Sequence, residues 1–204
     1  MPSTDYGRVY EEVSHAYGKP VKTRELDRSH SVVLVLAAVA VAVVAKTSRE
    51  PLTDSQFAAK AAQGSLAEVQ LGRLAAQKAQ NETVRAFGRR MATDHTKSKA
   101  KLEKIAARQN INLPEDLDKD AKQTYEKLSK LSGPDFDRAY ALDMLKDHKK
   151  DVAEFQKEAS AGKNEAIRSF AAETLPTLQN HLKAAQEMKE LFDRSVTAIS
   201  NLPK

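Results

Sequence analysis

The sequence predicts an all-α fold, a four-helix bundle that follows a separate leader. Apolar side chains recur at spacings of three and four residues through four long segments, which is the pattern of amphipathic helices. The 204 residues include only seven glycines and seven prolines, and the helix-favouring residues Ala, Lys, Glu, Gln and Leu recur throughout. With 41% apolar and 30% charged residues, the composition is that of a folded domain.

Residues 1–45 are predicted to be an export leader. The fifteen residues from Ser31 to Ala45 carry no charge, and three basic residues precede them between Lys22 and Arg28. Such a run fits the apolar core of a secretory signal, whereas a membrane-spanning helix needs about 20 residues. Val43 and Ala45 are small residues placed for cleavage near Ala45, and a retained inner-membrane anchor is the alternative. We therefore expect a protein of the periplasm or cell envelope that meets the export machinery, with possible envelope association.

Composition also excludes several kinds of site. The chain has no cysteine, which rules out a disulfide scaffold, an iron–sulfur cluster and a thiol nucleophile. Its formal net charge is +5, but basic and acidic residues alternate closely, as they do between Lys146 and Asp151. No arginine stripe with interleaved aromatic residues occurs, so we expect no nucleic-acid partner. These charges are best interpreted as solvated helix faces.

The bundle domain is predicted over residues 54–194, after a linker at 46–53. Thr53 and Gln56 have the spacing of a capping box, which places the first helix at about 54–79. The second helix follows a break near Gln80–Asn81 and extends past Ile105.

The third helix is predicted to begin at Gly133–Pro134, because proline suits the first helical position, and to end at Gly162. The fourth helix carries the apolar stripe from Ile167 to Phe192, and residues 195–204 are predicted to form a tail.

The connection between the second and third helices, Asn110–Ser132, is unusually long. Neighbouring antiparallel helices need only about 2–8 linking residues. A shorter amphipathic helix is predicted within this crossover, starting at Pro114 and reaching Leu131. The connection is long enough to climb the bundle, so the second and third helices are expected to run parallel, as in ferritin-like bundles.

Two helix starts resemble each other. Asn81-Glu82-Thr83-Val84-Arg85-Ala86-Phe87 and Asn164-Glu165-Ala166-Ile167-Arg168-Ser169-Phe170 share four identities. This similarity suggests that the first and second helical pairs are related halves, although chance similarity between helices of like composition is the alternative.

Four polar side chains interrupt the apolar stripes, one on each helix: Glu68, His95, His148 and His181. Counted from the helix ends at about 1.5 Å per residue, the first three fall at one height near mid-bundle. His181 is predicted to lie about 8 Å out of level by the same count.

Imidazole and carboxylate groups that converge inside a bundle are typical metal ligands. Glu68, His95, His148 and His181 are therefore candidate ligands of one transition-metal ion, namely copper, zinc or iron. A buried polar network without metal is the alternative. Residues that we expect to support the ligands or to replace one are Asp94, Asp147, Asp151, Glu173, Met91 and Met144.

Catalytic chemistry is less well supported. The di-iron signature Glu-x-x-His is absent from the four helices, and its only match, Glu12-x-x-His15, lies in the leader. There is no glycine-rich phosphate loop, and no serine or threonine stands in a recognisable nucleophile setting. We predict no catalytic residue, and a di-iron redox enzyme is the least expected reading.

Five motifs lie between Asp54 and Leu191, namely Phe57-x6-Gly64-x3-Glu68-x2-Leu71-x3-Ala75, Phe87-x3-Met91-x2-Asp94-His95, Asn112-Leu113-Pro114, Phe136-Asp137-x2-Tyr140-x3-Met144-x3-His148 and Leu175-Pro176-x4-His181-Leu182. In these motifs the sequence resembles the bacterial family of domains of unknown function numbered 4142. The resemblance implies a ferritin-like fold and an exported protein, often labelled periplasmic or outer-membrane, without an established activity. We accordingly expect a metal-binding or stress-protective envelope protein, or alternatively a structural or interaction module without metal.

Overall fold

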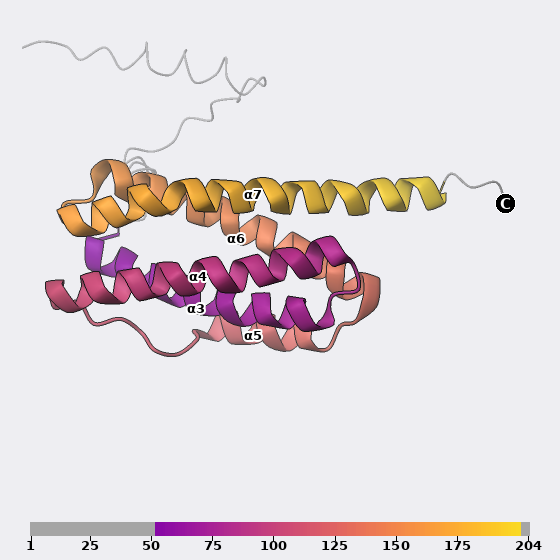
Figure 1. The fold of residues 1–204 in the computed structure, drawn as a ribbon, viewed down its shortest axis with the longest axis horizontal. Coiled ribbons are helices and arrows are strands. Elements are labelled where there is room, and N and C mark those ends of the chain that lie inside the picture. The colour runs from indigo at the N-terminus through magenta and orange to yellow at the C-terminus, as the bar shows by residue number, and fades with distance from the viewer. Residues whose placement is uncertain (1–51, 201–204) are drawn as a thin grey trace, which may run out of the picture. The chain divides into compact units, whose positions relative to one another are not determined.

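The computed structural model describes residues 52–200, with the side chains of residues 52–194, and within this range it confirms the all-α prediction (Figure 1). None of the helices in this range has the length and apolar character needed to cross a bilayer. The predicted leader at 1–45 and most of the linker at 46–53 lie outside the described residues. The helices are α3 (Asp54–Lys78), α4 (Glu82–Gln109), α5 (Lys119–Ser129), α6 (Gly133–Ala161) and α7 (Glu165–Ser200).

The first helix begins at the predicted capping box. The Thr53 hydroxyl accepts a hydrogen bond from the Gln56 backbone N–H at 3.2 Å, and the Thr53 N–H donates to Gln56 Oε1 at 2.9 Å. Each side chain thus satisfies an amide that the helix leaves without a partner. Proline stands in the first turn of α6, as expected.

Two boundaries differ from the prediction. α5 begins at Lys119 rather than at Pro114, because the Asp118 carboxylate accepts the Ala121 N–H at 2.8 Å and caps the helix there. α7 contains Pro176 and continues to Ser200, into the segment predicted as a tail, since no glycine or proline stands between Phe192 and Pro203.

The helices form two antiparallel hairpins, α3–α4 and α6–α7 (Figure 1). The crossover carries the chain back along the bundle through α5, so that α4 and α6 start at the same end and run parallel. The hairpins pack against each other through α4 with α7 and through α3 with α6. The predicted parallel arrangement of the second and third helices is therefore confirmed.

The apolar core consists of two clusters with a polar layer between them. One cluster includes Leu71, Met91, Tyr140 and Met188, and the other includes Phe57, Leu102, Phe155 and Ile167. Asp137 and Glu158 are buried near the two ends of α6. On every long helix the other buried polar residues fall between the segments that feed the two clusters. They are Ser65 and Glu68 on α3, His95 on α4, His148 on α6 and His181 on α7.

The two hairpins hold each other's turns through matched aspartates. Asp137 accepts hydrogen bonds from the N–H groups of Gln80 and Asn81 at 3.0 and 2.7 Å. Asp54 accepts hydrogen bonds from the N–H groups of Lys163 and Asn164 at 3.0 and 2.6 Å.

We call these contacts of Asp137 and Asp54 with the two turns the aspartate clamps. The two clamps are separated by the same number of residues as the two similar helix starts. Position 54 corresponds to position 137, and position 81 to position 164, each pair being 83 residues apart. Arg85 and Arg168, which have the same separation, donate to the turn carbonyls of Ala79 and Gly162 at 2.7 and 3.0 Å. The sequence similarity therefore has a structural counterpart in both turns.

α3 and α4 approach closely at a pair of glycines. A Cβ atom added to Gly72 would lie 2.6 Å from the carbonyl oxygen of Gly88, and one added to Gly88 would lie 2.7 Å from the carbonyl oxygen of Gly72. Glu68 lies one turn before Gly72, and His95 lies two turns after Gly88. The glycine contact therefore helps to set the spacing of these two side chains.

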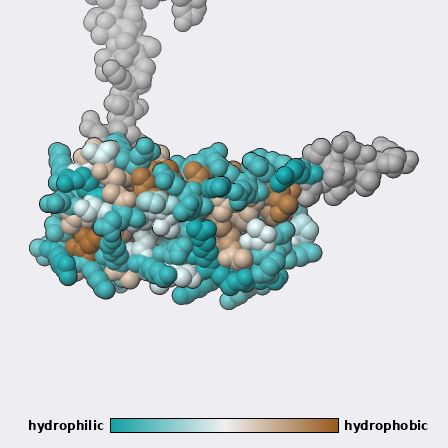
Figure 2. Space-filling view, turned by 45° about the horizontal axis from the view of Figure 1, so that its top comes forward, coloured by the Kyte–Doolittle hydropathy of each residue, from teal (hydrophilic) through white to brown (hydrophobic). Residues whose placement is uncertain are grey.

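The face of the bundle shown in Figure 2 is mostly hydrophilic, with small scattered apolar spots. Among the described residues the exposed large hydrophobic side chains are Leu142 (43% exposed) and Leu191 (37% exposed). The alternating surface charges therefore lie on solvated helix faces, as predicted.

Candidate metal centre

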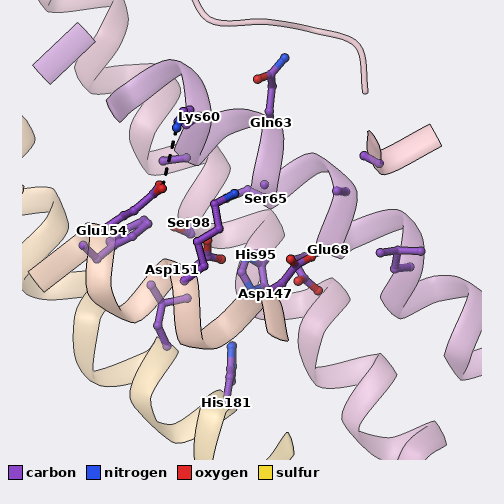
Figure 3. A pocket seen from close by; sticks show the side chains of 18 of the residues that line it. Lys60, Gln63, Ser65, Glu68, His95, Ser98, Asp147, Asp151, Glu154 and His181 are labelled. Carbon is purple, nitrogen blue, oxygen red and sulfur yellow. Dashed lines mark ion pairs between the residues drawn. The ribbon is translucent and has the colours of Figure 1, made fainter. Parts of the chain in front are cut away.

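Three imidazole rings from three helices meet in the polar layer. His95, His148 and His181 are buried, and their ring centroids lie 5.3 to 5.8 Å apart. One ring nitrogen from each histidine lies within 4.8 Å of those of the other two, so the three side chains could hold one metal ion. Figure 3 shows His181 pointing from its helix toward His95.

The predicted displacement of His181 is wrong. α7 begins at the α6–α7 turn, so the height of His181 along the bundle has to be counted from that turn. His148 lies 16 residues before Asn164 and His181 lies 17 residues after it. At about 1.5 Å per residue these distances differ by only one step, and the two rings are level.

The second ring nitrogens of two histidines are fixed by hydrogen bonds. His148 Nδ1 donates to the carbonyl oxygen of Met144 at 3.0 Å, and His181 Nε2 donates to Asp94 Oδ2 at 3.0 Å. Asp94 is in turn 3.5 Å from Arg90 Nε. Such bonds hold the tautomer and the orientation of an imidazole, and they are typical of metal-binding histidines.

The remaining nitrogens have no partner. His95 Nε2, His148 Nε2 and His181 Nδ1 are buried and accept or donate no hydrogen bond within the described part of the chain. A buried polar atom without a partner costs about 1–3 kcal/mol. Three such atoms, one on each ring of a single cluster, indicate a place for a shared ligand.

The rings are uncharged at neutral pH. Burial lowers the pKa of all three histidines, to about 4 for His148 and well below the usual value for His95. Repulsion from the neighbouring rings lowers the pKa of His95 and His148 further. A metal ion binds the neutral imidazole, so the ligand form is already present.

Glu68 lies beside this cluster. Its Oε1 is 3.9 Å from His148 Nδ1, the nitrogen that donates to Met144, and that distance is beyond hydrogen-bond range. Burial and the charges of Asp151, Asp147 and Asp143 raise the pKa of Glu68 well above its usual range. The group of three side chains that could hold a metal does not include Glu68.

A cavity of about 310 Å³ leads away from the cluster (Figure 3). Asp147 and Asp151, which we predicted as supporting residues, line it from α6. Asp143 lines it too and was missed, although its spacing of four residues from Asp147 puts both on one helix face. That repeated spacing was the available signal.

The other predicted supporting residues lie apart from the rings. The side chains of Met91 and Met144 belong to an apolar cluster, and Met144 contacts the centre through its backbone carbonyl. Glu173, expected as a replacement ligand, is exposed and pairs with Lys101 on α4. Because His181 is level with the other two histidines, Glu173, eight residues earlier on α7, lies about 12 Å away along the helix axis.

Comparisons with known proteins agree with this fold. A family model described as Domain of unknown function (DUF4142) matches residues 39–188. No curated protein matches the chain. A crystal structure of a DUF305 fragment from Deinococcus radiodurans is similar, with a TM-score of 0.58 and 16% sequence identity, over 69% of this chain and 95% of that one. This likeness supports the ferritin-like helical fold.

Proposed function

The chain belongs to the DUF4142 family, and from that premise and the geometry of its centre we propose that it binds one divalent transition-metal ion at His95, His148 and His181. The observation that carries the proposal is the convergence of three buried ring nitrogens that have no hydrogen-bond partner within residues 52–194. Two of the rings are oriented by hydrogen bonds on their other nitrogen, as in established metal sites.

The donor set suits zinc or copper(II). Imidazole binds both ions well, and three imidazoles leave a coordination position for water or another ligand. The side chains of Met91, Met144 and Met188 lie in the apolar core, so within residues 52–194 no sulfur ligand favours copper(I). Iron sites in bundles rely on several carboxylates as ligands, and here the carboxylates lie outside the group of three.

We propose that this ion is bound and held, without a catalysed reaction, in the periplasm or cell envelope. The leader sequence supports export, since its apolar run of fifteen residues follows a basic segment. Sequestering a reactive transition metal there would protect other envelope components, which is the stress-protective role that we propose.

Metal content tests this proposal. The full chain and a His95→Leu/His148→Leu variant are loaded with zinc or copper(II), dialysed and analysed for bound metal. Leucine is close to histidine in volume and offers no ligand atom, so the fold should persist, which circular dichroism checks. The matched control is His15→Leu/His30→Leu, because these are the other two histidines of the chain.

Stoichiometric metal in the native chain and in the control, but not in the double variant, supports the proposal. No bound metal in the native chain under any supply would leave the structural or interaction module as the function. Metal that survives the double substitution would place the binding site elsewhere.

A further inference from the structure

The cavity beside the histidines has a charge opposite to that of the chain. Eight carboxyl groups and three lysines line it, a formal excess of five negative charges when every carboxyl group is ionised, whereas the whole chain has a formal net charge of +5. One of the lysines, Lys60, lies 3.8 Å from Glu154 and is partly neutralised by it. The cavity is therefore a locally acidic region on a basic protein.

The lining connects solvent with the centre. Asp118 and Asp120, at the start of α5, are exposed, whereas His95 and His181 are buried at the inner end. Asp143, Asp147 and Asp151 line the cavity from successive turns of one face of α6, and all three are intermediate in burial. Figure 3 labels Asp147, Glu68 and His95 among the residues that line this cavity, and the charge of Asp147 raises the pKa of Glu68.

Glu68 marks the inner end as a place for a cation. Its side chain is 2% exposed, it lines the cavity, and its Oε2 has no hydrogen-bond partner among the described residues. Asp143 Oδ2 is likewise buried and without a partner. Carboxylate oxygens that are buried without a donor are stabilised by a metal cation or its bound water.

The carboxylates also destabilise one another when they are charged. Burial, and then the neighbouring carboxylate Asp147, raise the pKa of Asp143 to about 6 and that of Asp151 to about 7. A divalent cation that passes between them would relieve this repulsion.

We propose that this cavity is the loading path of the metal centre, along which Asp143, Asp147, Asp151 and Glu68 conduct a hydrated divalent cation to the three histidines. The path rests on the proposed function, because it ends at the same centre. The aspartates accept hydrogen bonds from the water ligands of the ion. Glu68 offers the last carboxylate oxygen ligand before the imidazoles. The negative potential of the cavity concentrates cations and excludes anions. It raises the rate at which the ion associates and leaves the final ligands unchanged.

Stopped-flow binding of cobalt(II) to the full chain tests the path. The visible absorption of cobalt(II) reports imidazole coordination, so loading is followed directly. Native chain is compared with Asp143→Asn/Asp151→Asn at about pH 8, where both native aspartates are charged. The matched control is Glu103→Gln/Glu187→Gln, which removes two carboxylates from exposed positions outside the cavity.

At low ionic strength we expect the aspartate variant to load about tenfold more slowly, with the same final spectrum, and the control to load at the native rate. The difference should shrink at about 0.5 M salt, where charges are screened. A native loading rate in the folded aspartate variant overturns the path and leaves the centre in place. No cobalt spectrum in the native chain overturns both.

Asp120→Asn provides a second variant at the exposed mouth, where a folding defect is not expected. It should slow loading by about twofold at low ionic strength, because one charge is lost from the field. An unchanged rate here, together with a double variant that does not fold, also overturns the path.

Discussion

His181 donates its Nε2 hydrogen to the carboxylate of Asp94 on the neighbouring helix, with 3.0 Å between the two atoms. This bond determines which nitrogen of the ring carries hydrogen, and it leaves Nδ1 free of hydrogen inside the cluster. Asp94 is adjacent to His95 in the sequence, but in the structure its carboxylate is hydrogen-bonded to a histidine 87 residues away.

Replacing Asp94 should weaken metal binding at the three histidines without removing a metal ligand. We expect Asp94→Ala to raise the dissociation constant for zinc by about 10–100-fold, because the ring of His181 loses its fixed tautomer and orientation. Competition with a chromophoric chelator measures this change. Asp116→Ala, which removes an exposed aspartate outside the cavity lining, is the control. Equal zinc affinity in both variants would show that the bond does not support metal binding.

The glycine contact between α3 and α4 predicts opposite effects of two alanine substitutions. Gly72→Ala places a methyl group 2.6 Å from the Gly88 carbonyl oxygen and should destabilise the fold by about 1–3 kcal/mol. Gly64→Ala meets nothing within 4 Å and should stabilise α3 by about 0.5–1 kcal/mol. Urea unfolding gives both values, and a loss of stability in Gly64→Ala would contradict this account of the helix contact.

The two aspartate clamps should differ in strength. Asp137 is 2% exposed and Asp54 is partly exposed, although each accepts two backbone hydrogen bonds. We expect Asp137→Ala to cost about 2 kcal/mol of unfolding free energy and Asp54→Ala to cost about 1 kcal/mol. Chemical denaturation of the two variants checks the order. A larger cost for Asp54→Ala would contradict the assigned role of burial.

Glu158 should make the fold less stable as pH rises. Burial, and then the charge and hydrogen bond of Asp54, raise its pKa from 4.5 to about 7. Between these two values the folded chain holds a proton that the unfolded chain has lost, so stability falls as pH increases across the window. Asp143 and Asp151 act in the same direction, because their pKa values are also raised.

Glu158→Gln removes one of these contributions. The unfolding midpoint of the variant should therefore fall less than that of the native chain between about pH 5 and pH 8. Glu187→Gln, an exposed change on α7, should leave the native slope unchanged. The same slope in Glu158→Gln as in the native chain would exclude a role for this carboxyl group.

Helix positions and the polar layer could be predicted because they depend on local patterns. The capping box at Thr53 and the proline after Gly133 are local signals, and both helices begin there. The histidines could be grouped because each interrupts an apolar stripe, and apolar stripes face one core.

Contacts between helices could not be predicted from these patterns. Whether Glu68 faces Nδ1 or Nε2 of His148 depends on the rotation of two helices about their axes, and a change of one residue turns a side chain by about 100°. Glu173 lies on the outer face of α7 for the same reason. The pairing of Asp94 with His181 depends on the packing of α4 against α7, which residue spacing within one helix does not specify.

Anomalous diffraction from crystals of the zinc-loaded chain tests the central claim most directly. An anomalous difference peak at the zinc edge locates the ion independently of activity or spectrum. We predict one peak, bonded to His95, His148 and His181 through the three nitrogens that have no hydrogen-bond partner among the described residues. A peak among the carboxylates of the cavity with the histidines left unbonded, or no peak in the bundle, would contradict the account.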